Sequence, residues 1–518
     1  MADTTIEPAA QTGLSSRTSA APPETSPRQG ARHEHRWWVL AVLALSQLMV
    51  VLDATIVNIA LPTAQEALNF GADQRQWVVT AYSLAFGGLL LLGGRLSDLF
   101  GRKITYIVGL AGFAAASAFG GAAQSFGELV TARAVQGAFG ALLAPAALSL
   151  LSTTFTDGRE RARAFGVFGA VAGSGGAVGL LLGGVLTEYW SWRWCLFVNL
   201  FFALVAMIGA FTFFGRQGPT GTRPKLDLPG TVIVSLGLVG VVYGFSSAET
   251  DGWGDARTIV ALVAGVVLLV AFVILESRVA HPLLPLRVVL DRQRGGSYLT
   301  VALTGAALFG VFLFLAYYLQ ALRGYTPLQT GLGFLPMPVT IALTSTLIAP
   351  NLLPRVGPKP MIVGGALLGG VGLLLLSRIG LDTSYATTIP PALVVLGLGM
   401  GLVFGAAFNT ATAGIDPRDA GVGSAMVNTS QQIGGSIGTA VLSTLAADTV
   451  SRYLQGHGTS GSAQQLAQLN GYHTVFHTSA GVFFAIAVMA VFVLRWGRPA
   501  AAAHAPAGQA SAAPTMAH

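Results

Sequence analysis

The sequence predicts an all-α integral membrane protein with 14 transmembrane helices, arranged as two six-helix bundles plus two inserted spans. Three observations lead to this fold class. Of the 518 residues, 53% are hydrophobic and only 10% are charged, far below the charged share of about 25% in soluble domains. Apolar runs long enough to cross a bilayer recur along the chain. Arginine and lysine gather in alternate loops between those runs, as the topology of membrane proteins requires.

The apolar runs have about 18 to 25 residues each, which matches the hydrocarbon core of a bilayer. They begin near Trp37, Trp77, Ile104, Glu128, Ala164, Trp192, Gly230, Thr258, Ser297, Gly331, Met361, Thr388, Ser424 and Val475. With the amino terminus inside, the inner segments carry 22 of the 29 Lys and Arg residues. We therefore expect a multi-pass protein of a cell membrane with both termini in the cytoplasm, and the preference for arginine over lysine suggests a bacterial source.

The chain is predicted to divide into five parts. Residues 1–36 and 497–518 are rich in small and polar residues and are expected to form disordered cytoplasmic tails. The loop at 355–364 echoes the loop at 100–109, a weak internal repeat that sets the last six spans against the first six. This repeat predicts an N-terminal six-helix bundle over 37–214, a linker with two inserted spans over 215–296, and a C-terminal six-helix bundle over 297–496.

Composition and motifs argue against other kinds of site. Cys195 is the single cysteine, so an internal disulfide or a cysteine metal site is excluded. The chain contains no P-loop, no metal-spaced His/Cys cluster and no nucleophile elbow. The net charge of +7 resolves into the inner loops and is a topology signal rather than a nucleic-acid footprint. We expect no catalytic residue, metal, cofactor or nucleic-acid partner, and a monomer in the lipid bilayer.

The loop between the second and third runs is the most informative stretch. It meets the pattern G-x-L-x-D-x-x-G-R-K at Gly94, Asp98, Gly101, Arg102 and Lys103. Charges of both signs are costly in hydrocarbon, so this loop must lie in water or among headgroups. Asp98 and Arg102 have the i, i+4 spacing at which opposite charges meet if the helix continues. The alternative interpretation is an ordinary basic loop with a tight turn at Gly101.

Two charged residues lie within the spans of the first bundle. Asp53 is near the outer end of the first span, where removal from water favours the neutral form of a carboxyl group and makes it a candidate proton carrier. Arg133 lies about five residues into the fourth span, so both side chains are about 8 Å below the outer boundary. The pair could couple a proton to a rearrangement, or it could be a static buried ion pair.

Polar and small residues within the spans suggest a pathway and its packing. Candidate pathway-lining residues are Gln47, Asn58, Tyr82, Tyr317, Asn428 and Gln432, although hydrogen bonds between helices explain any one of them as well. With few charges and several aromatic rings, these residues suit amphipathic or lipophilic small molecules. Gly179, Gly183 and Gly184 give the fifth span a face that permits close helix packing.

Four stretches together resemble the fourteen-span drug:proton antiporter family of the major facilitator superfamily. They are Leu52–Pro62, the loop at 94–103, Ala132–Gly137 and Ser191–Asn199. The resemblance implies the major facilitator fold and the proton gradient as energy source in place of a cofactor. It implies proton-driven export of drugs or antibiotics, with Asp53 and Arg133 in proton and substrate coupling. It also implies a conformational latch in the loop that contains Asp98 and Arg102.

One position departs from the family pattern. The antiporter motif of the fifth span normally carries a proline where this chain has Leu180, which removes one source of a helix kink. Two alternatives therefore stand beside efflux. One is proton-coupled transport of a nutrient or endogenous metabolite. The other is a membrane-embedded enzyme or a non-transporting sensor, which would need convergent acids, a metal cluster or a large soluble domain.

Overall fold

The computed structural model describes Ala2 and residues 35–71, 74–215, 227–279, 282–458 and 460–496. Within these ranges, 14 helical segments are long and apolar enough to span a membrane, which confirms the predicted fold class. The tails predicted over 1–36 and 497–518 lie almost entirely outside the described residues. Since the number of spans is even, the start of the first and the end of the last lie at one end of the molecule. We call this the inner end, because it is the one predicted to be cytoplasmic.

The first group of helices holds the two charged residues predicted to act together. It consists of α2 (Arg36–Leu68), α3 (Arg75–Phe100), α4 (Arg102–Ala122), α5 (Phe126–Thr154), α6 (Gly158–Tyr189) and α7 (Trp194–Phe213). Helix α2 packs on α6 and α7, while α5 packs on α3 and α4. Side-chain caps from Ser125 and Asp157 begin α5 and α6, so the ordinary capping rules fix these boundaries.

The two inserted spans form a hairpin of α8 (Leu228–Thr250) and α9 (Ala256–Glu276). Helix α8 packs on α9, on α3 and on α17, whereas the apolar span of α9 has only 17% of its residues buried. At the outer end the indole of Trp253 donates a hydrogen bond of 2.8 Å to Thr444 of α17. The hairpin therefore lies beside the junction of α3 and α17 and leaves most of α9 to lipid.

The second group begins with the short α10 (Leu286–Val289) and has more irregular helices. Helix α11 (Arg292–Tyr317) continues into the π-helical turn η1 (Tyr318–Leu322). The tenth span is broken into α12 (Pro327–Phe334), α13 (Pro336–Leu343), the π-helical turn η2 (Thr344–Ile348) and α14 (Ala349–Val356). Prolines at the first turns of these pieces lack the N–H that a continuous helix needs.

Four helices complete the second group: α15 (Pro358–Leu376), α16 (Tyr385–Ala411), α17 (Ala420–His457) and α18 (Gly461–Val493), with the 3₁₀ turn η3 (Pro417–Asp419) before α17. The last helix begins at Gly461 and not near Val475 as predicted from hydropathy. At 1.5 Å per residue, the 38 residues of α17 reach about 57 Å, well beyond a hydrocarbon core of about 30 Å. A hydropathy profile detects only the apolar part of a helix, which is the part that lies in lipid.

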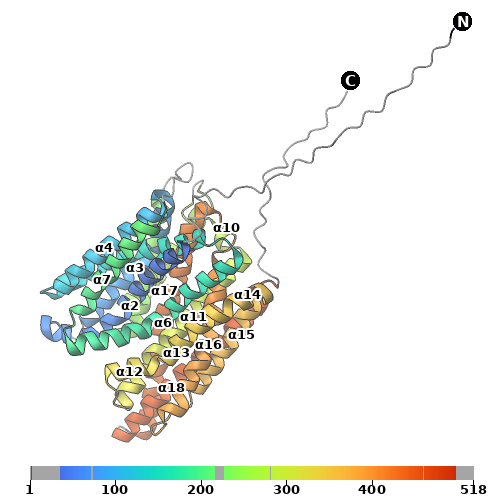
Figure 1. The fold of residues 1–518 in the computed structure, drawn as a ribbon. Coiled ribbons are helices and arrows are strands. Elements are labelled where there is room, and N and C mark those ends of the chain that lie inside the picture. The colour runs from blue at the N-terminus through green and yellow to red at the C-terminus, as the bar shows by residue number, and fades with distance from the viewer. Residues whose placement is uncertain are drawn as a thin grey trace.

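The two groups meet along two seams. Figure 1 shows the blue-to-green group beside the yellow-to-red group, with α6 running along the second group. Helix α6 packs on α12, α13, α14 and α16, and α17 packs on α3 and α5. At Gly94 an added Cβ would be 2.7 Å from the carbonyl oxygen of Gly421, so the backbones of α3 and α17 touch near the inner end. These seams are where the groups must part if the molecule opens.

Candidate functional site

Asp53 and Arg133 form an ion pair in the interior of the first group. Nη1 of Arg133 on α5 donates a hydrogen bond to Oδ2 of Asp53 on α2, and the two atoms are 2.6 Å apart. Asp53 is 0% exposed and Arg133 is 1% exposed. The two residues that the sequence placed at one depth are therefore in direct contact and shielded from water. An isolated charge in such surroundings is very costly, so each of the two ions depends on the other.

Three polar side chains complete the hydrogen bonding of the pair. Asp53 Oδ1 accepts one hydrogen bond from Gln136 and one from Asn199, both at 2.7 Å. Gln136 Oε1 also accepts from Arg133 at 2.7 Å, and both amides donate to the hydroxyl of Ser117. The five buried side chains come from α2, α4, α5 and α7, so a change of charge at Asp53 is felt by four helices at once.

The sequence analysis did not single out Gln136, Asn199 or Ser117 as site residues. Gln136 lies three residues after Arg133, on the same helical face, and this spacing was a usable signal. Asn199 and Ser117 offered no such signal, because the rotation of α7 and α4 about their axes decides whether they face Asp53. We call Asp53, Arg133, Gln136, Asn199 and Ser117 the Asp53 network.

Arg133 is also held by α3. Its Nε donates to the carbonyl oxygen of Val78 at 3.3 Å, and its guanidinium carbon lies 4.4 Å from the centre of the Tyr82 ring. Tyr82 is itself buried. The structure thus places one predicted pathway residue, Tyr82, directly on the network. A guanidinium with a fixed plane can satisfy an acid, an amide, a carbonyl and a ring together, which a lysine ammonium cannot.

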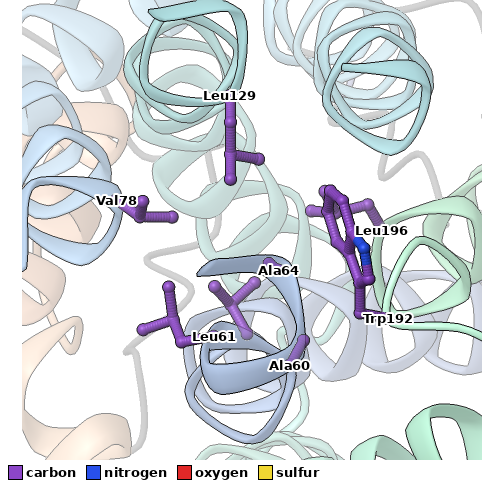
Figure 2. Close-up of a pocket in the computed structure, with 8 residues that line it drawn as sticks. Ala60, Leu61, Ala64, Val78, Leu129, Trp192 and Leu196 are labelled. Atoms are coloured by element: carbon purple, nitrogen blue, oxygen red, sulfur yellow. The ribbon is translucent and has the colours of Figure 1, made fainter. Parts of the chain in front are cut away.

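An apolar layer separates the Asp53 network from the outer end. Figure 2 shows the residues that line a cavity on this side of the network. The cavity has a volume of about 10 Å³, which has room for about one water molecule. It is lined by Val57, Ala60, Leu61, Ala64, Val78, Leu129, Trp192 and Leu196. In α2 these residues follow Asp53 toward the outer end, in α5 Leu129 precedes Arg133, and Trp192 and Leu196 lie just before and within the first turn of α7, ahead of Asn199. The side chains between the Asp53 network and the outer ends of these helices are thus apolar.

Asp98 makes a contact with the second group that the sequence analysis did not predict. Helix α3 ends at Phe100 and α4 begins at Arg102, and Gly101 between them has φ +92°, which favours glycine. Asp98 and Arg102 therefore lie on two different helices, and their opposite charges still attract each other across the turn. The carboxylate of Asp98 also accepts the backbone N–H groups of Gly421 at 2.9 Å and Val422 at 3.2 Å. These are at the start of α17, where a helix attracts negative charge.

The remaining residues of the loop make two different kinds of contact. Gly94 is on the seam with α17, one helical turn before Asp98 in α3. Lys103 donates to the carbonyl oxygen of Phe214 at 2.6 Å, at the end of α7, so its contact stays inside the first group. Of the five residues predicted to act as a latch, Gly94 and Asp98 touch the second group, Gly101 ends the helix that presents them, and Lys103 holds α4 to α7. Arg102 begins α4.

A second contact across the inner end comes from Arg161, which the sequence analysis did not single out. Its Nε donates to Asn409 Oδ1 at 3.0 Å and its Nη2 donates to Thr412 Oγ1 at 2.8 Å. The same guanidinium donates to the carbonyl oxygen of Ser152 at 2.8 Å. Arg161 thus ties α6 and α5 to α16, and with Asp98 it closes both seams at the inner end.

The glycines predicted for helix packing lie against α2. An added Cβ at Gly179 would collide with the hydroxyl of Thr55, and one at Gly183 would be 2.9 Å from the side chain of Ile56. Gly184 is also buried in α6. Helix α6 runs without a break through Leu180, the position of the missing family proline. Close packing on α2, the helix that carries Asp53, is thus the visible use of these glycines.

The other predicted pathway residues are scattered. Gln47 is buried in α2, and Gln432 of α17 faces Gly87 of α3 across the seam. Asn428 is buried and donates to the carbonyl oxygen of Ser424 within α17. Tyr317 lines a cavity of about 240 Å³ between α11, α17 and α18. The side chain of Asn58 lies outside the described residues. In the described ranges no group of three or more His, Cys, Asp or Glu residues gathers as metal ligands.

Known proteins are similar in sequence to this chain along nearly its whole length. The puromycin resistance protein pur8 of Streptomyces alboniger is 50% identical over 474 residues, covering 91% of this chain and 94% of that protein. The cephamycin export protein CmcT of Amycolatopsis lactamdurans is 37% identical over 508 residues, covering 98% of each.

One solved structure shows the same fold. The human organic anion transporter MFSD10 (TETRAN) superimposes with a TM-score of 0.61 at 16% identity, covering 88% of this chain and 99% of that one. A model of the Major Facilitator Superfamily matches residues 43–439. This match, the two bacterial relatives and the 14 spans give one consistent result: the chain belongs to the Major Facilitator Superfamily and is a multi-pass membrane transporter.

Proposed function

We propose that this protein is a proton-coupled exporter of antibiotics or similar amphipathic small molecules, with both termini in the cytoplasm. Relatives named for puromycin resistance, cephamycin export and tetracenomycin C resistance and export support the efflux direction and the substrate class. The observation that carries the proton coupling is the Asp53 network. A carboxylate that is fully buried against a guanidinium can give up its charge only together with a rearrangement of its partners.

The coupling follows from what each side chain holds. When Asp53 is ionised, its two oxygens accept three hydrogen bonds from α5 and α7. A proton on Asp53 removes the charge that balances Arg133 and replaces one acceptor with a donor. Arg133 then needs a new acceptor, and α5 must shift relative to α2 to supply one. The proton enters from the outer side once the apolar layer opens, and it leaves to the cytoplasm after the inner contacts part.

The inner contacts give the second half of the cycle. Asp98 and Arg161 hold the two groups together at the inner end, which leaves substrate no route from the cytoplasm in this arrangement. Release of both contacts would expose the space between α3, α6, α16 and α17 to the cytoplasm. The proton gradient supplies the energy, and neither ATP nor a bound cofactor enters the proposal. A single chain is sufficient for the cycle.

Transport into inverted membrane vesicles tests the proposal. Vesicles that contain the protein should accumulate radiolabelled puromycin only when their interior is acidified, and the Asp53→Asn variant should show no gradient-driven accumulation. Growth of an efflux-deficient host on puromycin, cephamycin C, lincomycin and tetracenomycin C extends the substrate range. Accumulation that is independent of the gradient would refute proton coupling. Gradient-driven uptake of a substrate into intact cells would instead favour a transporter of a nutrient or metabolite.

A further inference from the structure

The inserted hairpin carries a pair of acidic residues that the proposed transport cycle does not use. Asp227 precedes α8 and caps it, because its Oδ1 accepts the N–H of Gly230 at 3.0 Å. Glu276 is the last residue of α9, and its two oxygens accept the N–H groups of Leu283 and Leu284, each at 3.2 Å. Both side chains are buried, with 9% of Asp227 and 4% of Glu276 exposed.

The two carboxyl groups face each other across Gly230. Asp227 Oδ2 and Glu276 Oε1 both lie under 3.0 Å from the position that a Cβ at Gly230 would occupy, so only glycine leaves the space between them open. The two oxygens are therefore no more than about 5 Å apart, with no side chain between them. Two ionised carboxylates offer acceptors alone, and Asp227 Oδ2 is buried without a donor among the described residues. A hydrogen bond between them therefore requires a proton on one of them.

We propose that Asp227 and Glu276 share one proton, so that the inserted hairpin holds a proton-binding site separate from Asp53. Two carboxyl groups at this distance cannot both ionise without strong repulsion, and sharing a proton replaces that repulsion with a hydrogen bond. Because the pair joins the start of α8 to the end of α9, the proton closes the inner end of the hairpin. The proposal does not rest on the transport function.

The site is connected to the inner contact of Asp98 through packing. Leu283 and Leu284, whose N–H groups Glu276 holds, belong to one apolar cluster with Leu91 of α3 and with Val422 and Ala425 of α17. Val422 is one of the two residues whose N–H groups bind Asp98. Loss of the shared proton would push Glu276 away and release the segment that packs against the start of α17.

Other charged groups at this end have contacts of their own. Asp98 on α3 is bound to α17, Asp419 before α17 pairs with Arg287 at 2.8 Å, and Arg278 after α9 is exposed. Arg294 of α11 donates to the carbonyl oxygens of Val288 and Gly414. Asp227 is the charged group that acts on Glu276. The pH response of the site is therefore the response of this pair.

Infrared difference spectroscopy of the purified full-length protein in lipid tests the shared proton directly. A protonated carboxyl group has a C=O stretch that a carboxylate lacks. We expect one such band at neutral pH that is lost in Asp227→Asn and in Glu276→Gln and kept in Asp53→Asn. Asparagine still caps a helix, so the first variant keeps the start of α8. A band that survives in both hairpin variants, or is lost only in Asp53→Asn, would overturn the proposal.

Amide hydrogen exchange tests the consequence. In the wild type, exchange in 282–291 should accelerate at alkaline pH by more than the intrinsic base-catalysed increase, because the hairpin end opens when the proton leaves. Glu276→Gln offers a permanent donor to Asp227, so its corrected exchange should not change with pH. The same pH dependence in both proteins would refute the link, whatever the outcome of the transport assay. Asp448→Asn, which changes an exposed carboxylate on α17, should respond like the wild type.

Discussion

Replacement of Asp53 by Asn tests how the buried network stores and releases a charge. The substitution keeps the shape of the side chain but offers one acceptor oxygen where the carboxylate offered two. The new NH₂ group then points at donors, because Oδ1 of Asp53 receives the amides of Gln136 and Asn199. If Gln136 turns its amide to accept, its Oε1 no longer accepts from Arg133. If only Asn199 turns, the NH₂ group of Gln136 still faces the new NH₂ group. The variant cannot satisfy the network in any orientation.

The cost follows from the burial of Arg133, which keeps its charge when Asp53 loses it. Removal of one partner from a buried ion pair costs about 3 to 5 kcal/mol, because the remaining charge is uncompensated. The exposed pair Asp448 and Arg452 in α17 provides a matched control, with side chains 54% and 69% exposed. Asp448→Asn removes the same type of interaction and should cost less than about 1 kcal/mol.

Thermal unfolding in one lipid-detergent mixture compares the two variants, and gradient-driven transport is measured on the same preparations. We expect Asp53→Asn to unfold at a clearly lower temperature than Asp448→Asn and to lose coupled transport, whereas Asp448→Asn keeps both. A double variant with Arg133→Gln should recover stability without recovering transport, since no charge remains buried. If Asp53→Asn is as stable as Asp448→Asn and still concentrates substrate, the ion pair has neither the energetic nor the coupling role argued above.

Three further changes probe the contacts around the network. Arg133→Lys keeps the charge but cannot hold an acid, an amide, a carbonyl and a ring at once, so transport should fall strongly; wild-type rates would show that charge alone is sufficient. Asp98→Asn weakens the interaction with the start of α17 by about 0.3 to 2 kcal/mol. This should shift the ratio of inward-open to outward-open molecules several-fold, and spin-label distances across the inner end should detect the shift. Unchanged distances with lost transport would contradict the latch. Gly179→Ala drives a methyl group into Thr55 and should cost about 1 to 3 kcal/mol of stability, whereas Gly364→Ala, where the structure leaves open space, should cost far less.

The spans were predictable because the thickness of the bilayer limits the length of an apolar run, and the number found agrees with the number predicted. The shared depth of Asp53 and Arg133 was predictable for the same reason. The position of a residue along a span gives the depth of its side chain in the membrane, because each residue adds a fixed rise of 1.5 Å along the helix. It does not fix the direction in which the side chain points.

The partners of these residues depend on that direction and on contacts between distant segments. Asn199 reaches Asp53 only because α7 turns one particular face toward α2. Asp98 binds N–H groups on α17, more than 300 residues further along the chain, and local spacing instead suggested Arg102. The turn signal at Gly101 marks the end of α3, whereas the i, i+4 rule describes only residues within one continuous helix.

The apolar layer on the outer side of the Asp53 network affects how many protons cross the membrane without substrate. An exporter that runs on a proton gradient wastes that gradient each time a proton crosses without cargo. Here the apolar layer leaves a cavity of about 10 Å³, which has room for about one water molecule and not for a continuous chain of water. Under the proposed coupling, this layer limits the proton leak through a molecule that carries no substrate. A polar residue in place of Leu61 or Leu129 should increase that leak.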